Sequence, residues 1–288
     1  MQTHVFHFLT LTALHVGKGQ GVGVVDLPIA RSRATNLPIV AGSALKGVLR
    51  DELKEQHQLE AKDINTLFGK NENADHAGAI AFGDAHLLLL PIRSFAGVVA
   101  YATCPFILRQ YQRDTGLVLD IPAIMDNSAR IVADSALLLN GKIALEDLDI
   151  EAHDTNLTED WAEAITAMLY PESVANHQEW RDEVKKRFVI LPDSIFSFLA
   201  DTATEIRTRI RINRETRVVQ DGALWTEENL PADSVLWGVL GVSDSRSGDK
   251  KSADELSKLL PTKEINLQIG GKHTVGRGFC RLLISQKP

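Results

Sequence analysis

Three glycine-containing segments could bring backbone groups close to a phosphate or a ribose. The first is Gly17-Lys18-Gly19-Gln20-Gly21-Val22-Gly23, which leads through two valines to Asp26. Glycine at every second position lets N–H groups approach an anion without a clash from Cβ. The same spacing is also compatible with a turn that has only a structural role.

Two common nucleotide-binding loops do not fit this first segment. A dinucleotide-binding loop opens directly into a helix and has an acid about 20 residues further on. Here Asp26 and Pro28 follow the glycines, and no acid lies between Asp26 and Asp51. A Walker A loop is excluded as well, because no Gly-Lys-Ser or Gly-Lys-Thr ends the segment.

The second and third segments also suit an anion. In 38–47, Gly42 and Ser43 stand at the start of an expected helix, with Lys46 one turn further on. Ser43 is the expected N-cap, and a stripe of three leucines and one valine supports the helix: Leu45, Val48, Leu49, Leu53. A helix N-terminus offers unpaired N–H donors and the positive end of the helix dipole. The alternative for this segment is a capped surface helix with a solvated lysine. The third segment, Ile269–Gly278, is either a phosphate-tracking loop or a flexible hairpin connection.

Basic residues are concentrated in two stretches, although the chain has a net charge of −7. A negative total argues at first against nucleic acid, since phosphate binding is driven by basic surfaces. The alternative is that both stretches are ordinary solvated faces. The first stretch has one acid and five basic residues, and the second has two acids and five: Lys18, Arg31, Arg33, Lys46, Arg50; Arg207, Arg209, Arg211, Arg214, Arg217.

A β-hairpin is expected to present the second basic stretch. From Thr204 to Asn213 the residues alternate, with isoleucines and a threonine on one face and three arginines on the other. Asn213–Thr216 can turn and Arg217–Val219 can return. Ala223–Pro231 then brings an aromatic residue and two acids close behind: Trp225, Glu227, Glu228. We predict a protruding hairpin.

The remaining pattern alternates strands and helices irregularly, without internal repeats. Thr158–Ala200 is mostly helical in pattern, with Trp161, Trp180 and Phe188 as expected core residues. Asn140-Gly141 predicts a tight hairpin turn. The other expected strands are Thr3–Val16, Gly78–Leu90, Ser234–Val242, Glu264–Gln268 and Gly278–Ser285, and the other expected helices are Ser43–Gln56, Pro105–Arg113 and Ala253–Leu260.

Composition favours an ordinary globular protein. The 288 residues, 44% hydrophobic and 24% charged, suit one large domain with its own core. Cys104 and Cys280 are expected to be reduced thiols, since no secretory context is evident. No signal peptide is evident, and the longest apolar stretch, Phe95–Leu108, is too short for a bilayer and contains a proline. We expect a cytoplasmic protein with no membrane contact.

The order of the three segments resembles the RAMP superfamily of CRISPR proteins, over essentially the whole chain. Gly21–Arg33, Phe82–Ala85, Thr103–Pro105 and Gly222–Glu228 resemble in particular the repeated backbone subunit of type III-B (Cmr) effector complexes. The resemblance implies an α+β fold with a ferredoxin-like (RRM-like) palm, helical insertions and a protruding thumb β-hairpin. Residues 1–135 and 232–288 would then form the palm core, 136–200 a mainly helical insertion and 201–231 the thumb, in one domain.

The resemblance also implies a function. Copies of the chain would stack along a CRISPR RNA beside other Cmr subunits and cleave paired single-stranded target RNA at regular intervals. Asp26 would be the catalytic residue and would transiently hold a weakly bound Mg²⁺ or Mn²⁺, with His15 and Glu227 as candidate assistants. Cleavage by the 2′-hydroxyl would leave a 2′,3′-cyclic phosphate and a 5′-hydroxyl. The RNA-binding residues would be Lys18, Gly19, Gly21, Gly23, Arg31, Arg33, Gly42, Ser43, Lys46, Arg50, Arg207, Arg209, Arg211, Trp225, Gly270, Gly271, Thr274, Val275, Gly276 and Arg277.

Two other functions stay open at this stage. A non-catalytic RNA-binding backbone subunit would share the fold, and Asp26 would then be an ordinary loop residue. A small-molecule enzyme that uses the glycine loops for a nucleotide is the more remote alternative. For the two assistants the alternatives are a satisfied strand histidine at His15 and a solvated charge at Glu227.

Overall fold

The computed structural model combines a large mixed sheet, helices and a separate two-stranded hairpin, and it describes residues 1–21, 23–56, 59–70, 76–248 and 250–286. The α+β class is therefore confirmed. The helices are α1 (Gly42–Glu55), α2 (Ala61–Phe68), α3 (Pro105–Thr115), α4 (Asn156–Leu169), α5 (His177–Lys186), α6 (Asp193–Thr202), α7 (Ala253–Ser257) and a 3₁₀ turn (His273–Val275). The strands are β1 (Gln2–Thr10), β2 (Ile39–Val40), β3 (Ile80–Phe82), β4 (Ala85–Arg93), β5 (Val99–Thr103), β6 (Ser128–Ile131), β7 (Lys142–Leu145), β8 (Leu148–Asp154), β9 (Phe188–Ile190), β10 (Glu205–Ile212), β11 (Val219–Asn229), β12 (Val235–Val242), β13 (Ile265–Gln268) and β14 (Phe279–Gln286).

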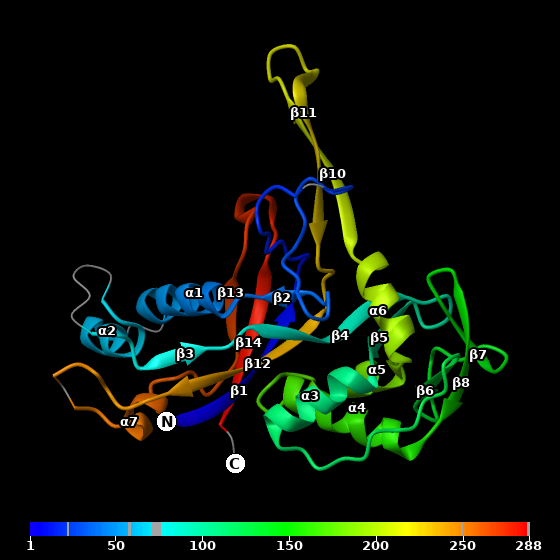
Figure 1. The fold of residues 1–288 in the computed structure, drawn as a ribbon, viewed down its shortest axis with the longest axis horizontal. Helices are drawn as coiled ribbons and strands as arrows, with labels where there is room; N and C mark the ends of the chain where they lie inside the picture. The colour runs from blue at the N-terminus through cyan, green and yellow to red at the C-terminus, as the bar shows by residue number, and fades with distance from the viewer. Residues whose placement is uncertain (22, 57–58, 71–75, 249, 287–288) are drawn as a thin grey trace.

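Strand β1 is an interior strand of the main sheet. It pairs antiparallel with β12 on one side and β14 on the other, and β12 pairs onward with β4. Both faces of β1 carry apolar residues, and the residues from His4 to Thr10 are all buried. A strand that is covered on both faces reads as a continuous apolar run rather than as an alternation. The order β14-β1-β12-β4 forms the centre of the molecule (Figure 1).

The sheet continues from β4 into a second region at the opposite end from α1 and α2. Strands β5, β9, β6, β8 and β7 follow β4 in that order, with α3 to α6 in the same half of the molecule (Figure 1). Trp161 and Phe188 are completely buried there, as expected, but Trp180 is 52% exposed. Trp180 instead stacks on Tyr170 at a centroid distance of 6.0 Å. Residues 136–200 thus contain α4, α5 and α6 together with three strands, β7, β8 and β9.

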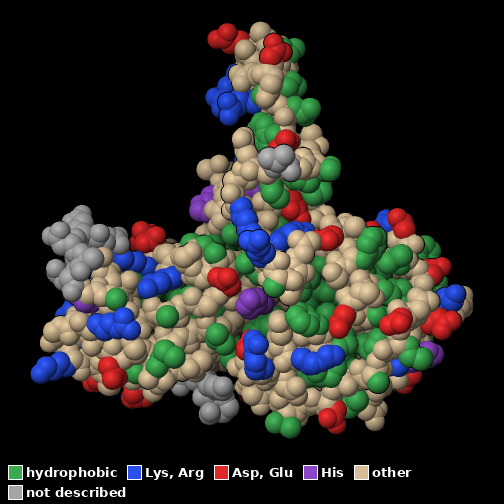
Figure 2. Space-filling model, in the orientation of Figure 1, with side chains coloured by type: hydrophobic (Ala, Val, Ile, Leu, Met, Phe, Trp, Pro, Cys, Tyr) green, Lys and Arg blue, Asp and Glu red, His purple; other side chains and the backbone are tan. Residues whose placement is uncertain are grey.

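The hairpin of β10 and β11 projects from the body of the molecule (Figures 1 and 2). Its register places Arg207 opposite Glu227, Arg209 opposite Trp225 and Ile210 opposite Leu224. Because facing residues of an antiparallel pair lie on the same side, the hairpin has one cationic and aromatic face and one apolar face. The predicted protruding hairpin is confirmed, with β11 continuous rather than broken between a short return and a second segment.

Three other expected elements differ from the structure. The first strand ends at Thr10 rather than Val16, because the next two N–H groups donate to the Phe279 carbonyl and leave the ladder with β12. The expected strand Gly78–Leu90 is interrupted at Gly83 and Asp84, where β3 ends and β4 begins. The Asn140-Gly141 turn has positive φ at both residues, but the main partner of β7 is β8 and not the segment before the turn.

Helix α1 matches its expected range to within one residue at each end, yet Ser43 is not its cap. The capping position is Ala41, and the Asp84 carboxylate accepts the Gly42 N–H at 2.9 Å. A Cβ at Gly42 would lie 2.5 Å from the carbonyl oxygens of Phe82 and Gly83. Glycine is therefore required where α1 starts against the β3–β4 connection. Among the described residues, no helix is both long enough and apolar enough to cross a membrane.

His7 makes the stability of the core depend on pH. Its ring is 1% exposed, and Nε2 lies 2.7 Å from the Tyr111 hydroxyl. Burial lowers the pKa of His7 from 6.5 to about 4. Between these values the unfolded chain binds a proton that the folded chain does not bind. Stability is thus complete above pH 6.5 and falls as the pH drops towards 4.

We predict that His7 contributes about 2.5 kcal/mol to the loss of unfolding free energy between pH 7 and pH 4.5. The variant His7→Gln, measured by chemical denaturation at both pH values, should lose correspondingly less stability on acidification than the wild type. His153→Gln, which changes an exposed histidine, is the control and should behave like the wild type. An unchanged pH dependence in His7→Gln would contradict the prediction.

Candidate functional site

Three segments that are far apart in the sequence meet at the base of the hairpin. Leu14 bridges to Leu230, and Leu27 bridges in parallel to Glu227. The Gly271 N–H donates to the His15 carbonyl at 2.9 Å. The loop after β1, the base of β11 and the loop before β14 are thus joined by backbone hydrogen bonds. This is where the first and third glycine segments come together.

Asp26 is exposed and is attached to the hairpin through Thr226. Its Oδ2 accepts the Thr226 N–H at 2.7 Å and the Thr226 hydroxyl at 2.9 Å. The Asp26 N–H donates to the same hydroxyl oxygen at 3.0 Å. These hydrogen bonds, led by the backbone one, lower the pKa of Asp26. Oδ1 makes no hydrogen bond among the described residues and remains open to a ligand.

His15 is buried against the same junction. Nδ1 lies 2.7 Å from the Glu228 carbonyl oxygen. Because a carbonyl can only accept, Nδ1 must carry the proton, and Nε2 of the neutral ring is then an acceptor. A Cβ on Gly17 would lie 2.9 Å from this Nε2. The first glycine segment therefore passes directly over the ring of His15.

Glu227 is completely buried and lies among three cations. Its carboxylate is 3.9 Å from Arg209 Nε, 3.7 Å from an Arg277 terminal nitrogen and 3.9 Å from Lys272 Nζ. These distances exceed hydrogen-bonding range, so the attraction is Coulombic. Three positive charges against one negative charge leave the cluster net positive. The burial of Glu227 excludes the solvated charge considered as an alternative, and its cationic surroundings do not fit a proton-transfer role.

The rest of the cationic face of the hairpin continues outward from this cluster. Lys272 lies over the ring of Trp225 at 5.5 Å, a cation–π contact. The indole N–H of Trp225 is buried and has no hydrogen-bond partner in the part of the chain that the structure describes. Arg207 pairs with Glu205 at 2.5 Å, and Arg211 is exposed. A ring and several guanidinium groups on one exposed face suit stacking and phosphate neutralisation.

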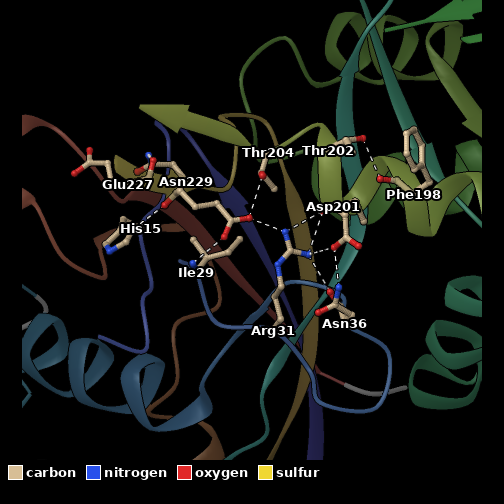
Figure 3. A network of polar contacts seen from close by, with 12 residues as sticks. His15, Ile29, Arg31, Asn36, Phe198, Asp201, Thr202, Thr204, Glu227 and Asn229 are labelled. Carbon is tan, nitrogen blue, oxygen red and sulfur yellow. Dashed lines mark hydrogen bonds and ion pairs between the residues drawn. The ribbon is translucent and has the colours of Figure 1, made fainter. Parts of the chain in front are cut away.

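Arg31 is held inside the protein instead of facing solvent. One terminal nitrogen lies 2.6 Å from Glu228 Oε1, and the other lies 3.0 Å from Asp201 Oδ1. Both nitrogens also donate to the Ala200 carbonyl, and one donates to the Asn36 carbonyl. Figure 3 shows Arg31 reaching from its loop towards Asp201 and Thr204. This geometry does not fit the RNA-binding role predicted for Arg31.

The exposed part of the first basic stretch is smaller than the sequence indicates. Lys18 Nζ donates to the Arg31 carbonyl, whereas Arg33 is exposed and has no ion pair among the described residues. Gly19, Gly21 and Gly23 are all exposed. Val22, between the last two, lies outside the described residues.

The predicted anion site at the start of α1 already has an anionic partner. Asp84 accepts the first N–H there, so a phosphate would meet a carboxylate. Lys46 Nζ donates to the Ile80 carbonyl at 2.9 Å, and burial together with the charge of Arg50 lowers its pKa. Arg50 lies 3.5 Å from the Asn65 amide oxygen. Ser43 is exposed beside them.

The backbone of the third glycine segment has several residues in the left-handed region, with positive φ. Gly270 has φ of 88°, and a Cβ there would collide with the His15 carbonyl. Gly271, Thr274 and Val275 are exposed, and Gly276 has φ of 77°. Arg277 is only 8% exposed, since it turns inward towards Glu227. In this loop, solvent and a ligand can therefore reach the backbone and the side chains of Lys272, His273, Thr274 and Val275, whereas Arg277 is turned away from them.

Several residues of the site were missed in the sequence. Thr226, Lys272 and Asp84 stand inside recognised segments, but their partners are distant in the chain. Glu228 and Asp201 are separated from Arg31 by 197 and 170 positions. Of these, only Thr226 carried a local signal, because alternation places it on the opposite face from Trp225 and Glu227.

No group of three or more His, Cys, Asp or Glu side chains that could hold a metal ion occurs in the described part of the chain. Mg²⁺ is often held by one or two carboxylates together with substrate phosphates, and it keeps several waters. The unbonded Oδ1 of Asp26 is chemically suited to such a weak site.

Comparisons with known proteins agree with this architecture. The RAMP superfamily model matches residues 7–281. The CRISPR system Cmr endoribonuclease Cmr4 of Pyrococcus furiosus is 36% identical over 296 residues, which cover 99% of this chain and 97% of that protein. The chain belongs to the RAMP superfamily and, within it, to the family of Cmr4 endoribonucleases.

Solved structures support the same assignment. The crystal structure of oligomeric Cmr4 from Pyrococcus furiosus superposes with a TM-score of 0.75 at 29% identity and covers 99% of this chain and 98% of that chain. A chain of the type III-B Cmr-β complex bound to cognate target RNA gives a TM-score of 0.76 at 23% identity, with 99% and 97% covered. This second likeness shows the fold alone.

Arg31 and Arg33 provide a matched test of the internal network. Arg31→Gln leaves the buried Glu228 carboxylate without its cation, and we expect the unfolding free energy to fall by about 3 kcal/mol. Arg33→Gln, two residues away and exposed, should change it by less than about 0.5 kcal/mol. Chemical denaturation of both variants checks this difference, and equal stabilities would contradict the internal role of Arg31.

Proposed function

We propose that this chain is the RNA-binding and RNA-cleaving backbone subunit of a type III-B CRISPR ribonucleoprotein. In this proposal it binds CRISPR RNA, stacks with copies of itself and with other Cmr subunits, and cuts paired target RNA at regular intervals. The observation that carries the proposal is Asp26, an exposed and hydrogen-bonded carboxylate at the base of a cationic hairpin, in a chain of the Cmr4 endoribonuclease family. The similar structures include oligomeric Cmr4 from Pyrococcus furiosus and the type III-B Cmr-β complex bound to cognate target RNA.

The chemistry follows from where the charges lie. The 2′-hydroxyl of the target loses its proton and its oxygen attacks the adjacent phosphorus. The P–O5′ bond breaks and the leaving 5′-oxygen takes up a proton, which gives a 2′,3′-cyclic phosphate and a 5′-hydroxyl. Asp26 has a lowered pKa, so it is ionised at neutral pH and available on its Oδ1 side. Its role is to orient the attacking 2′-hydroxyl in line with the P–O5′ bond, and such positioning is worth several orders of magnitude in rate.

A divalent ion, Mg²⁺ or Mn²⁺, is part of the proposal. Asp26 would hold it weakly through Oδ1 together with RNA phosphate oxygens, and the ion would supply charge neutralisation at the cleaved phosphate.

We assign RNA binding to exposed backbone groups and exposed cationic side chains, and not to all of the RNA-binding residues expected from the sequence. Arg207, Arg211, Arg33 and Lys272 are reachable, and the glycine loops expose N–H groups. The face around Trp225 suits base stacking, which tolerates any sequence.

We also propose a ferredoxin-like palm. It is supported by the antiparallel strand order β14-β1-β12-β4 and by α1, which follows β1 and precedes β4 in the sequence. A cytoplasmic location remains a prediction.

The first test is target cleavage by the reconstituted complex containing Asp26→Ala. We expect cleavage to fall at least about 100-fold, while guide and target binding change by less than about twofold, because Asp26 makes no contact with the cationic face. Denaturing gels follow the regularly spaced products, and filter binding follows affinity. Wild-type cleavage by the variant would place the active site elsewhere. No cleavage by either protein would favour the non-catalytic backbone subunit.

Removal of divalent ions tests the proposed role of Mg²⁺ or Mn²⁺ in cleavage. EDTA should abolish cleavage by the wild-type complex, and Mg²⁺ or Mn²⁺ should restore it, since no permanent metal cage occurs among the described residues. Target binding in EDTA serves as the control and should persist. Undiminished cleavage in EDTA would remove the divalent ion from the mechanism.

A further inference from the structure

The loop that carries Asp26 has few side-chain attachments of its own. Val24 is fully exposed, and three glycines around it are exposed as well. The Gly21 N–H donates to the Asp26 carbonyl, which closes the loop on itself rather than on the body. Among the described residues 17–21 and 23–26, Asp26 is the residue whose side chain hydrogen-bonds to the hairpin. Next to it, the Leu27 N–H donates to the Thr226 carbonyl at 3.1 Å and the Leu27 carbonyl accepts from the Glu228 N–H at 3.0 Å, so the backbone attaches the loop to β11. The contact between the side chains of Asp26 and Thr226 therefore decides the orientation of the carboxylate and not the attachment of the loop.

In this contact the hydroxyl group of Thr226 is both a hydrogen-bond donor and a hydrogen-bond acceptor. Oγ1 donates to Asp26 Oδ2 at 2.9 Å and accepts from the Asp26 N–H at 3.0 Å. The hydroxyl thus fixes the backbone and the carboxylate of Asp26 relative to each other. The Thr226 N–H adds a third bond at 2.7 Å, which any residue at position 226 could donate except proline.

The backbone bond alone leaves the carboxylate able to rotate. A single hydrogen bond to Oδ2 defines a distance, whereas the second bond, from a hydroxyl that is itself held by the Asp26 N–H, defines the plane of the carboxylate as well. The free Oδ1 is then aimed in one direction. Small misplacements of a reacting group cost large factors in rate.

We propose that Thr226 is a positioning residue for target-RNA cleavage: its hydroxyl orients the Asp26 carboxylate relative to strand β11 of the hairpin. The inference rests on the proposed catalytic role of Asp26. It assigns Thr226 no contact with RNA and no part in proton transfer.

The hairpin contains a matched control for this residue. Thr208 lies directly opposite Thr226 in the register, on the same face, and is exposed. No hydrogen bond from its hydroxyl occurs among the described residues. Replacement of either threonine by valine keeps the shape and the β-branched character of the side chain and exchanges only the hydroxyl group for a methyl group.

The experiment compares complexes with Thr226→Val, Thr226→Ser, Thr208→Val and Asp26→Ala. We expect Thr226→Val to lower the single-turnover cleavage rate at saturating target by about 10- to 100-fold, with target affinity within about twofold of the wild type. Thr226→Ser keeps the hydroxyl and should restore most of the rate. Thr208→Val should cleave like the wild type.

The outcomes separate the inference from the function on which it rests. If Asp26→Ala is inactive while Thr226→Val cleaves at the wild-type rate, the positioning role is wrong and the proposed function stands. If Asp26→Ala cleaves normally, the active site lies elsewhere, and the catalytic role of Asp26 fails together with the inference that rests on it. Loss of target affinity in Thr226→Val, or a Thr226→Ser variant as slow as the valine variant, would also overturn the positioning role.

Discussion

The buried ion pair between Arg31 and Glu228 is the contact on which the arrangement of the site depends. Glu228 Oε1 accepts from Arg31 and from the Thr204 hydroxyl, and Oε2 accepts from the Ile29 N–H. Arg31 in turn reaches the end of α6 through Asp201. A two-stranded hairpin is marginal in isolation. This network fixes its base to the cleavage loop and to the body.

Strand β11 distributes its neighbouring residues between two tasks. Thr226 and Glu228 point to one side and hold the loop of Asp26 and Arg31. Trp225 and Glu227 point to the other side and gather Arg209, Lys272 and Arg277. The separation follows from the period of two in a strand. A register slip of one residue would exchange the two faces and dismantle both sets of contacts.

Sequence patterns predicted the helices and strands better than they predicted which residues contact each other. The strict alternation in 204–213 predicted β10 and its arginine face, and the stripe of leucines predicted α1 almost to the residue. Resemblance supplied the function and the importance of Asp26. The ends of β1 and β4 were misjudged because hydrogen bonds to Phe279 and the Gly83-Asp84 interruption are set by distant segments.

The roles of the charged residues were the hardest to predict, for a physical reason. Arg31 and Arg33 have the same side chain and lie in the same loop, yet one is saturated by internal acceptors and the other faces solvent. Glu227 and Glu228 are adjacent and both buried, but alternation sends one into a cation cluster and the other to an arginine and an N–H group. Composition counts all four charges alike. Only the partners, nearly 200 positions away in the case of Arg31 and Glu228, decide which charge is structural and which is left to meet a phosphate.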